Sequence, residues 1–222
     1  MREDAWLGKR LGCAAWTVEA SDTIDHLSAL GPGFFQTRVP TSDLARVGSL
    51  ERVGFRTVDV SITFRRDPGL PLPAHPARTR DARPDDRHAV MTIAEREYDV
   101  SRFHLDPGIP DGVARSIKRE WADNYFMGAR GDRMFVAEHD DEVAGFQLVL
   151  DTPEAAVIDL IAVAGTARGQ GIGSSLVCGL ARSSPGRAVQ AGTQVANLPA
   201  LRMYGRLGFS VARTDYVLHR HV

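Results

Sequence analysis

The stretch "ARGQGIGSSL", residues 167–176, places three glycines within five positions: Gly169, Gly171 and Gly173. Glycine loses more backbone freedom on folding than any other residue, so such a run indicates that another group approaches the backbone closely. An apolar, strand-like segment (155–163) precedes the stretch, and a helical pattern over 172–184 follows it. The N–H groups at the start of that helix would form an anion site, most naturally for a pyrophosphate.

Arg168 adds a fixed positive charge to this loop, and Ser174 can donate a hydrogen bond to a phosphate oxygen. Two common phosphate-binding motifs do not fit the stretch. A Walker loop requires a lysine that is missing here, and a dinucleotide-binding fingerprint requires a glycine where Leu176 stands. From these residues alone, a tight turn without a ligand is the remaining alternative.

The residues after a Pro-rich segment alternate between strand-like and helix-like patterns. Asn197 is a suitable N-cap for the last helix, and Gly208 is a suitable stop. The patterns predict a helix that begins near Asp111, a hairpin over 133–151, a strand over 155–163, a helix over 172–184, a strand over 187–195, a helix after Asn197 and a C-terminal strand. This order implies an α/β protein of the α+β type, with a mixed sheet and helices on its faces.

The order Arg168-Gly-Gln-Gly-Ile-Gly173 resembles the pyrophosphate loop R/Q-x-x-G-x-G/A of the GNAT superfamily of acyl-CoA-dependent N-acyltransferases. A second motif of that family follows at the expected separation: Asn197, Ala200, Tyr204, Gly208 and Phe209. The resemblance covers roughly residues 90–222. It implies the GNAT acyltransferase fold, acetyl-CoA or another acyl-CoA as co-substrate, no metal, and transfer of the acyl group to a primary amine.

The resemblance implies three segments that contact the acyl-CoA. The strand before the loop would open into a V and pair its backbone with the pantetheine arm, through Ile161, Ala162 and Val163. The loop and the following helix start would hold the pyrophosphate through Arg168, Gly169, Gln170, Gly171, Ile172, Gly173 and Ser174. The last helix would contribute Asn197, Ala200 and Tyr204.

The resemblance also makes Tyr204 the expected general acid. A phenol with a pKa of ~10 stays protonated at neutral pH and can donate to a thiolate leaving group with a pKa of ~8.5. N–H groups near Val163 would polarise the thioester carbonyl. Asp159 and His104 are both candidates for the general base, and a chain of water molecules is the alternative. Tyr204 could instead be a packed core aromatic.

The segment "DPGLPLPAHPARTRDARPDDR", residues 67–87, carries five of the twelve prolines and predicts a linker without a regular helix or central strand. We therefore expect three parts: an N-terminal part (1–66), a linker (67–89) and an acyltransferase domain (90–222). The stretch "RLGFSVARTDYVLHR" (206–220) echoes "RVGFRTVDVSITFRR" (52–66). Either the N-terminal part is a truncated GNAT-like copy, or two helix-to-strand turns have converged.

Within the superfamily, the chain is similar to the TDP-fucosamine acetyltransferases, which acetylate the amine of a nucleotide-linked amino sugar. The best shared sequence motifs are "SRF" (101–103) and "TQ" (193–194). The resemblance implies that the acceptor contacts Arg102, Phe103, His104 and Gln194. Three alternatives remain open from the sequence: another small amine, a lysine or N-terminus of a protein, and a non-catalytic acyl-CoA-binding protein.

Composition narrows the remaining classes of partner. The net charge of −1 gives no general attraction to nucleic acid or to an anionic membrane, and no apolar run approaches the ~20 residues of a membrane span. Cys13 and Cys178 lack metal-site spacing, and no HxxxH pair occurs. We expect a cytoplasmic enzyme without a metal, and the strand-like C-terminus leaves a homodimer open.

Overall fold

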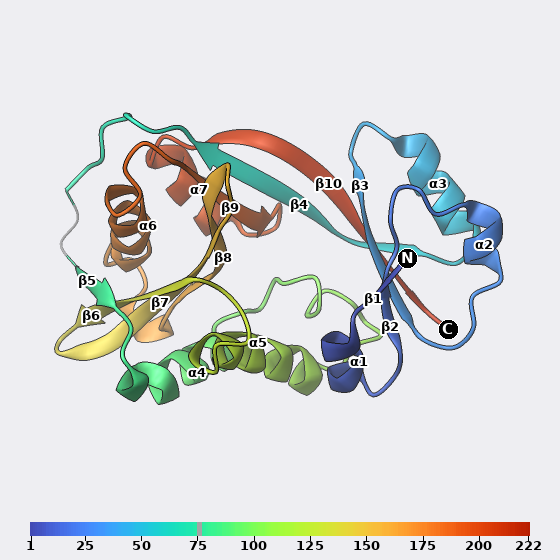
Figure 1. Cartoon of the computed structure of the whole chain (residues 1–222), viewed down its shortest axis with the longest axis horizontal. Coiled ribbons are helices and arrows are strands. Elements are labelled where there is room, and N and C mark those ends of the chain that lie inside the picture. The colour runs from blue at the N-terminus through green and yellow to red at the C-terminus, as the bar shows by residue number, and fades with distance from the viewer. Residues whose placement is uncertain (75–76) are drawn as a thin grey trace.

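The computed structural model describes residues 1–74 and 77–222. Figure 1 shows two lobes, one at each end of the molecule. The N-terminal lobe begins with β1 (Arg2–Glu3), α1 (Ala5–Leu11), β2 (Ala15–Thr17), α2 (Ile24–Ser28), β3 (Phe34–Pro40), α3 (Leu44–Arg52) and β4 (Arg56–Arg66). The chain continues with β5 (Arg78–Asp81), α4 (Arg87–Arg96), α5 (Asp111–Phe126), β6 (Arg133–His139), β7 (Glu142–Asp151), β8 (Ala155–Val163), α6 (Ile172–Arg182), β9 (Ala188–Gln194), α7 (Leu198–Arg206) and β10 (Ser210–His221).

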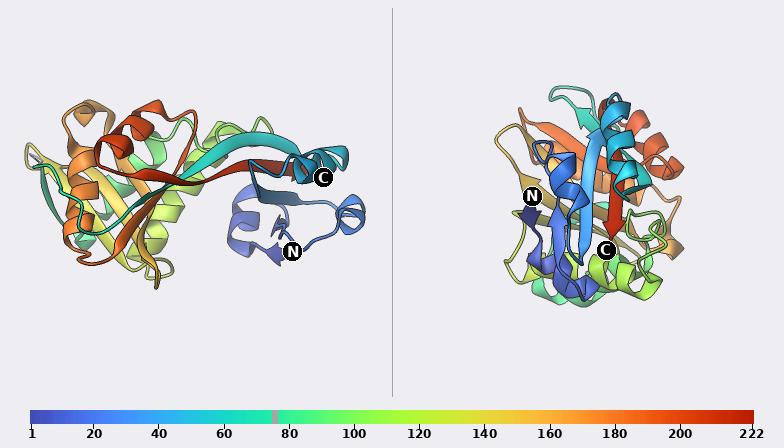
Figure 2. Two further views of the ribbon diagram at one scale, coloured as in Figure 1. Left: turned by 90° about the horizontal axis from the view of Figure 1, so that it is seen from above. Right: turned by 90° about the vertical axis from the view of Figure 1, so that its right-hand side faces the viewer.

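The strands of the described residues join into one mixed ten-stranded sheet that passes through both lobes. Their order is β1-β2-β3-β10-β4-β9-β8-β7-β6-β5. Strands β4 and β10 are long and antiparallel, and they run from one lobe into the other (Figure 2). The α/β fold predicted from the order of the elements is therefore confirmed, with both parts of the chain sharing one sheet.

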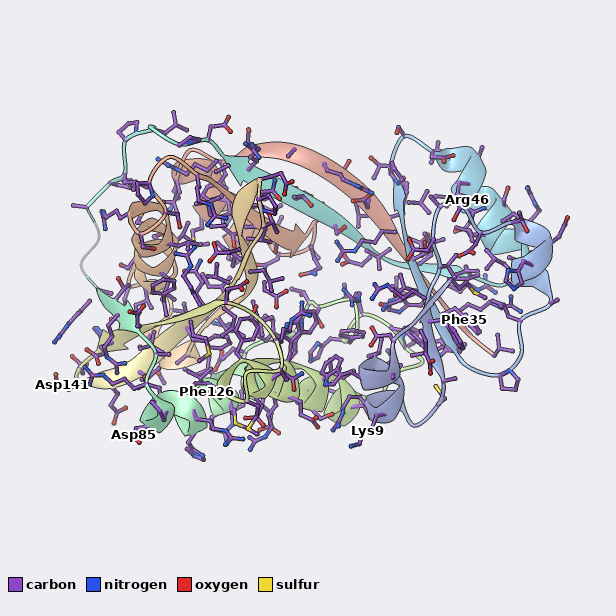
Figure 3. The ribbon with its side chains drawn as sticks, in the orientation of Figure 1. Lys9, Phe35, Arg46, Asp85, Phe126 and Asp141 are labelled. Carbon is purple, nitrogen blue, oxygen red and sulfur yellow. The ribbon has the colours of Figure 1, made fainter. Side chains whose placement is uncertain are left out.

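Helices cover both faces of the sheet in the C-terminal lobe. On one face, α6 and α7 pack on a core that includes Ile158, Val177 and Tyr204. On the other face, α4 and α5 pack on a core that includes Leu160 and Phe146. The N-terminal lobe has its own core, to which α3 and β10 contribute and which contains Phe35, labelled in Figure 3.

The two lobes exchange their last strands. The segments β3-α3-β4 and β9-α7-β10 each run strand, helix, Gly-Phe turn, strand, and Gly54 and Gly208 both adopt positive φ angles in those turns, 95° and 79°. Strand β10 lies between β3 and β4, while β4 lies between β10 and β9. The two stretches whose sequences echo each other thus pair antiparallel, with Tyr216 opposite Val60.

Most element predictions in the C-terminal lobe agree with the structure to within two residues. In the segment expected as a linker, residues 78–81 form the edge strand β5, which pairs with β6, and α4 begins at Arg87. Both elements pack in the C-terminal lobe. An edge strand pairs on one side only, which is why a Pro-rich segment can still supply one. Residues 75 and 76 of the linker lie outside the described residues.

Candidate active site

Strands β8 and β9 separate halfway along their length. Their parallel pairing ends at Ile158 opposite Ala191. Beyond that point β8 stays paired with β7 as far as Val163, and β9 stays paired with β4 as far as Gln194. The inner edges of the two strands are therefore not paired with each other. Backbone N–H and C=O groups along such edges can pair with an extended guest chain.

A β-bulge lies at the point of separation. Ile158 pairs with Val149 and Leu160 pairs with Leu148, so Asp159 has no partner on β7. An extra residue bends a strand and increases its twist, which turns β8 away from β9. The bulge also changes the face to which the side chains point, because Ile158 packs on the α6 side and Leu160 packs on the α5 side.

Asp159 is a buried carboxylate bound by four hydrogen bonds. Arg130 donates one to each oxygen at 2.7 Å, and Trp121 Nε1 and the Tyr125 hydroxyl donate to Oδ2 at 2.7 and 2.8 Å. Burial acts to raise the pKa of Asp159, but Arg130 and the two aromatic donors outweigh it and lower the pKa. The network fixes the bulge to α5 and to the loop after it.

The glycine loop has the geometry of an anion site. Gly169 and Gly171 adopt φ angles of 82° and 79°, a region that side chains other than glycine rarely enter. Gly171 is the N-cap of α6, and no side chain caps this helix, so its first N–H groups point outward unpaired. Gly173 has a different role, because a Cβ there would lie 3.1 Å from the sulfur of Met203 on α7. Val163 lies beside this helix start, since the same Cβ would contact it at 3.7 Å.

The other predicted loop residues surround this helix start. Arg168 is half exposed and forms an ion pair with Glu97, at 2.7 Å between Nη2 and Oε2. Gln170 is exposed between the two left-handed glycines, Ile172 is buried, and Ser174 is partly buried in the first turn. Arg168 therefore connects the loop to the segment that follows α4.

Helix α7 places its three predicted residues differently. The Asn197 side chain caps the helix by accepting a hydrogen bond from the Ala200 N–H at 3.3 Å. Ala200 packs on the core beneath α7. Tyr204 is 1% exposed and lies between Phe64 and Phe209, with ring centroids 5.4 and 5.1 Å away. Burial raises the pKa of Tyr204 above its ordinary range.

Sequence reasoning missed Tyr98, which reaches the open strand from the segment after α4. Its hydroxyl donates a hydrogen bond to the Ile161 carbonyl at 2.7 Å. Burial raises the pKa of Tyr98 well above its ordinary value, and the neighbouring Tyr204 phenol contributes. The two phenols therefore lie near each other beside the separated part of β8.

The four residues predicted to contact the acceptor occupy two segments. Arg102 stacks on Phe103, with 4.5 Å from Cζ to the ring centroid, and its Nε is buried without a hydrogen-bond partner among the described residues. Burial and the nearby Arg38 lower the pKa of Arg102 to about 10. The Gln194 carbonyl accepts a hydrogen bond from the Asn197 N–H at 3.0 Å, so Gln194 links the end of β9 to the cap of α7.

His104 is packed against the start of α5. Its Nδ1 lies 2.6 Å from the Ser101 hydroxyl, and its buried Nε2 lies 4.0 Å from Asp111 Oδ1 and has no hydrogen-bond partner in the described part of the chain. Burial lowers the pKa of His104, with a further contribution from the cation of Lys118. His104 is therefore neutral at neutral pH.

Lys118 is the second residue that sequence reasoning missed. It lies on the inner face of α5, is 8% exposed, and has Ala114, Trp121, Ala122 and Tyr125 on the same face. Its ammonium nitrogen lies 4.8 Å from the Tyr98 ring centroid and 5.0 Å from that of Trp121. The signal was present in the sequence: this lysine interrupts the apolar stripe of an amphipathic helix.

Within the described ranges, 1–74 and 77–222, no three histidine, cysteine, aspartate or glutamate side chains are arranged to hold a metal ion. No helix of that part of the chain is both long and apolar enough to cross a membrane.

Known proteins share this fold and this sequence pattern. The family model described as Acetyltransferase (GNAT) family matches residues 88–209. The spore coat polysaccharide biosynthesis protein SpsD of Bacillus subtilis (strain 168) is 32% identical over 139 residues, which are 61% of this chain and 48% of that protein. The chain thus spans about half the length of this curated relative.

Solved structures agree with the family match. A functionally unknown conserved protein from Staphylococcus epidermidis ATCC 12228 superposes with a TM-score of 0.67 at 16% identity, over 97% of this chain and 88% of the other. A GCN5-related N-acetyltransferase from Sphaerobacter thermophilus gives 0.59 at 19% identity, over 86% of this chain and 60% of the other. At these identities the likeness shows the fold alone.

An opened strand pair beside an uncapped, glycine-rich helix start can take up an extended, anionic guest molecule. The family model matches more than half of the chain and identifies the class of protein. The chain belongs to the GNAT family of acetyltransferases. The family uses acetyl-CoA as its co-substrate.

Proposed function

We propose that the protein acetylates the primary amine of a nucleotide-linked amino sugar. The acetyl-CoA part of this proposal rests on the position of the open edges of β8 and β9 beside the start of α6. An extended pantetheine arm can pair with the backbone of Ile161, Ala162 and Val163. Its pyrophosphate then reaches the loop from Arg168 to Ser174, whose N–H groups and arginine favour an anion.

Tyr204 is the general acid of this proposal. Its raised pKa keeps the phenol protonated over the whole neutral range. The thiolate that leaves during the reaction would form in the same apolar surroundings, where burial raises the pKa of a thiol as well and favours proton transfer to it. Asn197 and Ala200 position the helix that carries the phenol.

The environment of Asp159 supports a positioning role rather than that of a base. Four donors occupy the carboxylate, and their combined effect lowers its pKa, so it binds a proton poorly at neutral pH. Its contribution is to hold the bulge that opens β8. His104 lies with Arg102 and Phe103 on the segment that we assign to the acceptor side of the site.

The proposed nucleotide-linked acceptor is supported by the Arg102 guanidinium, which has no hydrogen-bond partner among the described residues. In the described part of the chain, Arg102 forms neither a hydrogen bond nor an ion pair, although its Nε is buried. The Asp4 and Asp59 carboxylates favour the Arg102 cation, but burial outweighs them and lowers its pKa, so a phosphate of the acceptor is a fitting ligand. The role that the name of SpsD gives it, in spore coat polysaccharide biosynthesis, agrees with a sugar acceptor.

We further propose that the N-terminal lobe is a truncated GNAT-like copy. The matching order of β3-α3-β4 and β9-α7-β10 supports it, and so do the two Gly-Phe turns and the reciprocal exchange of strands. In this arrangement the N-terminal lobe closes the acceptor side of the site, which suits a small enclosed acceptor better than a long peptide.

The test is acetyl-CoA consumption with a matched set of amines. The set contains a TDP-linked 4-amino-4,6-dideoxy sugar, the same amino sugar without the nucleotide, a lysine-containing peptide and a simple alkylamine. We expect acetyl-CoA to raise the melting temperature, and the nucleotide-linked sugar to give the highest kcat/KM. Arg102→Gln should remove most of that preference by raising KM.

Two results would contradict the proposal at different points. If acetyl-CoA leaves the melting temperature unchanged, the donor site is wrong. If the free amino sugar or the peptide reacts as well as the nucleotide-linked sugar, the acceptor is wrong while the acetyltransferase activity stands.

A further inference from the structure

We propose that Lys118 is the general base that removes a proton from the acceptor amine. This inference rests on the amine acetylation proposed above. The chain contains only two lysines, Lys9 and Lys118, among its 27 lysine and arginine residues. Lys9 is exposed on α1 and is labelled in Figure 3, whereas Lys118 is buried on the inner face of α5.

The Lys118 nitrogen lies over two aromatic rings that are each hydrogen-bonded to the separated part of β8. One neighbour is Tyr98, whose hydroxyl is bonded to the Ile161 carbonyl. Another is Trp121, whose indole N–H is bonded to Asp159 at the bulge. The Tyr98 ring therefore separates the Lys118 nitrogen from Ile161, and the Trp121 ring separates it from Asp159. Both Ile161 and Asp159 belong to the part of β8 where we expect the thioester.

Aromatic rings surround the nitrogen on three sides. The centroids of Tyr98, Trp121 and Phe103 lie 4.8, 5.0 and 5.9 Å from it. Within the described residues, the nitrogen has neither a hydrogen bond nor an ion pair. The ring faces favour the cation, but no carboxylate of the described residues pairs with the nitrogen, so the lone pair of the neutral amine is free to accept a proton from a substrate.

The charged groups around Lys118 come from four parts of the chain. Arg102 lies on the segment after α4 and Arg38 on β3, and both disfavour a further positive charge. Asp159 on β8 favours it, although Arg130 already neutralises that carboxylate. His104, on the same segment as Arg102, is itself lowered in pKa by the Lys118 cation.

These surroundings favour the neutral amine. Burial, followed by the repulsion from Arg102, lowers the pKa of Lys118 to about 7. A base with a pKa near the working pH is both unprotonated and able to accept a proton. Asp159 and His104 do not combine these two properties, because both have pKa values below their ordinary ranges.

The proton balance can be written in full. The neutral Lys118 amine takes one proton from the acceptor ammonium, and the freed amine nitrogen forms a C–N bond with the thioester carbonyl carbon. The C–S bond then breaks, and Tyr204 protonates the leaving sulfur. Tyr204 recovers a proton from the nitrogen of the new amide, and Lys118 releases its proton to solvent.

The first test is the pH dependence of kcat in Lys118→Met, Lys118→Arg and the matched control Lys9→Met. The acceptor should have an amine pKa above 9, so that its own titration is separated from that of Lys118. Wild type and Lys9→Met should rise to a plateau with an apparent pKa of about 7. Both Lys118 variants should lose about 10²-fold or more in kcat at pH 7.5. The rise in kcat around pH 7 should be absent from their pH profiles.

A structural role for Lys118 predicts a different pattern. Lys118→Met would then alter thermal stability while retaining kcat within threefold and the same pH profile, and that result would overturn the proposal. Circular dichroism and the melting temperature show whether the variants fold. Lys118→Arg provides a second check, because it keeps the positive charge but cannot lose a proton at this pH.

A second measurement does not depend on finding the acceptor. Brief reaction with acetic anhydride at pH 5 to 10, followed by peptide mass spectrometry, gives the labelling rate of each lysine. We expect the rate at Lys118 to reach half its maximum near pH 7, with exposed Lys9 as the internal reference for reagent reactivity. A midpoint near 10, as for an ordinary lysine, would overturn the proposal even if no amine in the set were acetylated.

Discussion

At the scale of single residues, the proposed proton donor, Tyr204, and the proposed proton acceptor, Lys118, lie on opposite faces of one opened strand. Tyr204 belongs to the core under α6 and α7, and Lys118 lies on α5 at the other face. The strand between them carries the bulge at Asp159, which Arg130 holds in place. Attack on one side of the thioester and departure of the thiolate toward the other can therefore use two separate proton carriers.

Removing the Tyr204 hydroxyl tests the donor side. Tyr204→Phe keeps the ring between Phe64 and Phe209, so packing and acetyl-CoA affinity should change little. We expect kcat to fall by about 10²-fold or more, because the leaving thiolate loses its proton donor. Steady-state kinetics with the best acceptor measure this, and Tyr216→Phe in the N-terminal lobe is the matched control. An unchanged kcat would leave Tyr204 only a packing role.

At the scale of elements, the loop before α6 is joined to the segment after α4, which we assign to the acceptor. Arg168 forms its ion pair with Glu97, the residue directly before Tyr98. Tyr98 in turn bonds to Ile161 on the open strand. A pyrophosphate at the start of α6 would compete with Glu97 for Arg168, so donor binding would change a contact of the segment that leads to Arg102.

Calorimetric titration with acetyl-CoA tests this competition. Arg168→Ala should weaken binding roughly 10-fold, since one exposed charge-assisted contact is lost. Glu97→Gln should tighten binding, because it frees Arg168 for the pyrophosphate. The difference between the two variants should shrink at 1 M salt, where exposed charges are screened. Equal affinities in wild type and Arg168→Ala would contradict the role given to this arginine.

The sequence predicted the elements around the donor loop well, and the reason is local. Left-handed glycines, the Asn197 cap and regular apolar spacing determine a loop or a helix from a few neighbouring residues. The bulge at Asp159 could not be predicted in this way, because it depends on the register between β7 and β8. Lys118 was missed although its place in the apolar stripe of α5 was visible, since its significance comes from Tyr98 and Arg102, which lie elsewhere in the sequence.

At the scale of the whole molecule, the segment between α4 and α5, which carries Arg102 and His104, is bound to β10. Asp106 accepts hydrogen bonds from His219 Nδ1 at 2.7 Å and from His221 Nε2 at 2.9 Å. Burial acts to raise the pKa of Asp106, but these bonds and one from the Gly108 N–H lower it to about 2. Burial lowers the pKa of His219 despite its carboxylate partner. The cluster joins the Arg102 segment to β10.

These shifts predict a loss of stability in acid. Below pH 6.5 the His219 side chain binds a proton in the unfolded chain more readily than in the folded protein, so the free energy of unfolding falls as the pH falls. Asp106 contributes stability above its unfolded pKa of about 4, and this contribution is lost as the pH falls toward 2. In urea unfolding, Asp106→Asn should lower the free energy of unfolding by about 1–3 kcal/mol at pH 7. It should also make that free energy depend less on pH below pH 4. The exposed control Asp140→Asn should lie within about 0.5 kcal/mol of wild type.

The exchange of β4 and β10 makes a stronger prediction about the molecule as a whole. Strand β4 pairs with both β9 and β10, so a fragment beginning at residue 67 would lose the strand between them. The fragment would also expose Tyr204 and Phe209, because Phe64 of β4 belongs to their core. We therefore expect residues 67–222 to be insoluble or unfolded when expressed alone, since unpaired strand edges and an open core favour aggregation.

Co-expression of the missing part provides the decisive comparison. Residues 1–66 should restore solubility and acetyl-CoA binding to residues 67–222, because the long β4–β10 pairing can re-form between two chains. Residues 1–55, which end before β4, are the matched control and should not. A folded fragment 67–222 that binds acetyl-CoA unaided would show that the donor site needs no strand from the N-terminal lobe. From the observed pairing we expect the donor site to need β4, because β4 holds the edge of β9 that faces away from the opening.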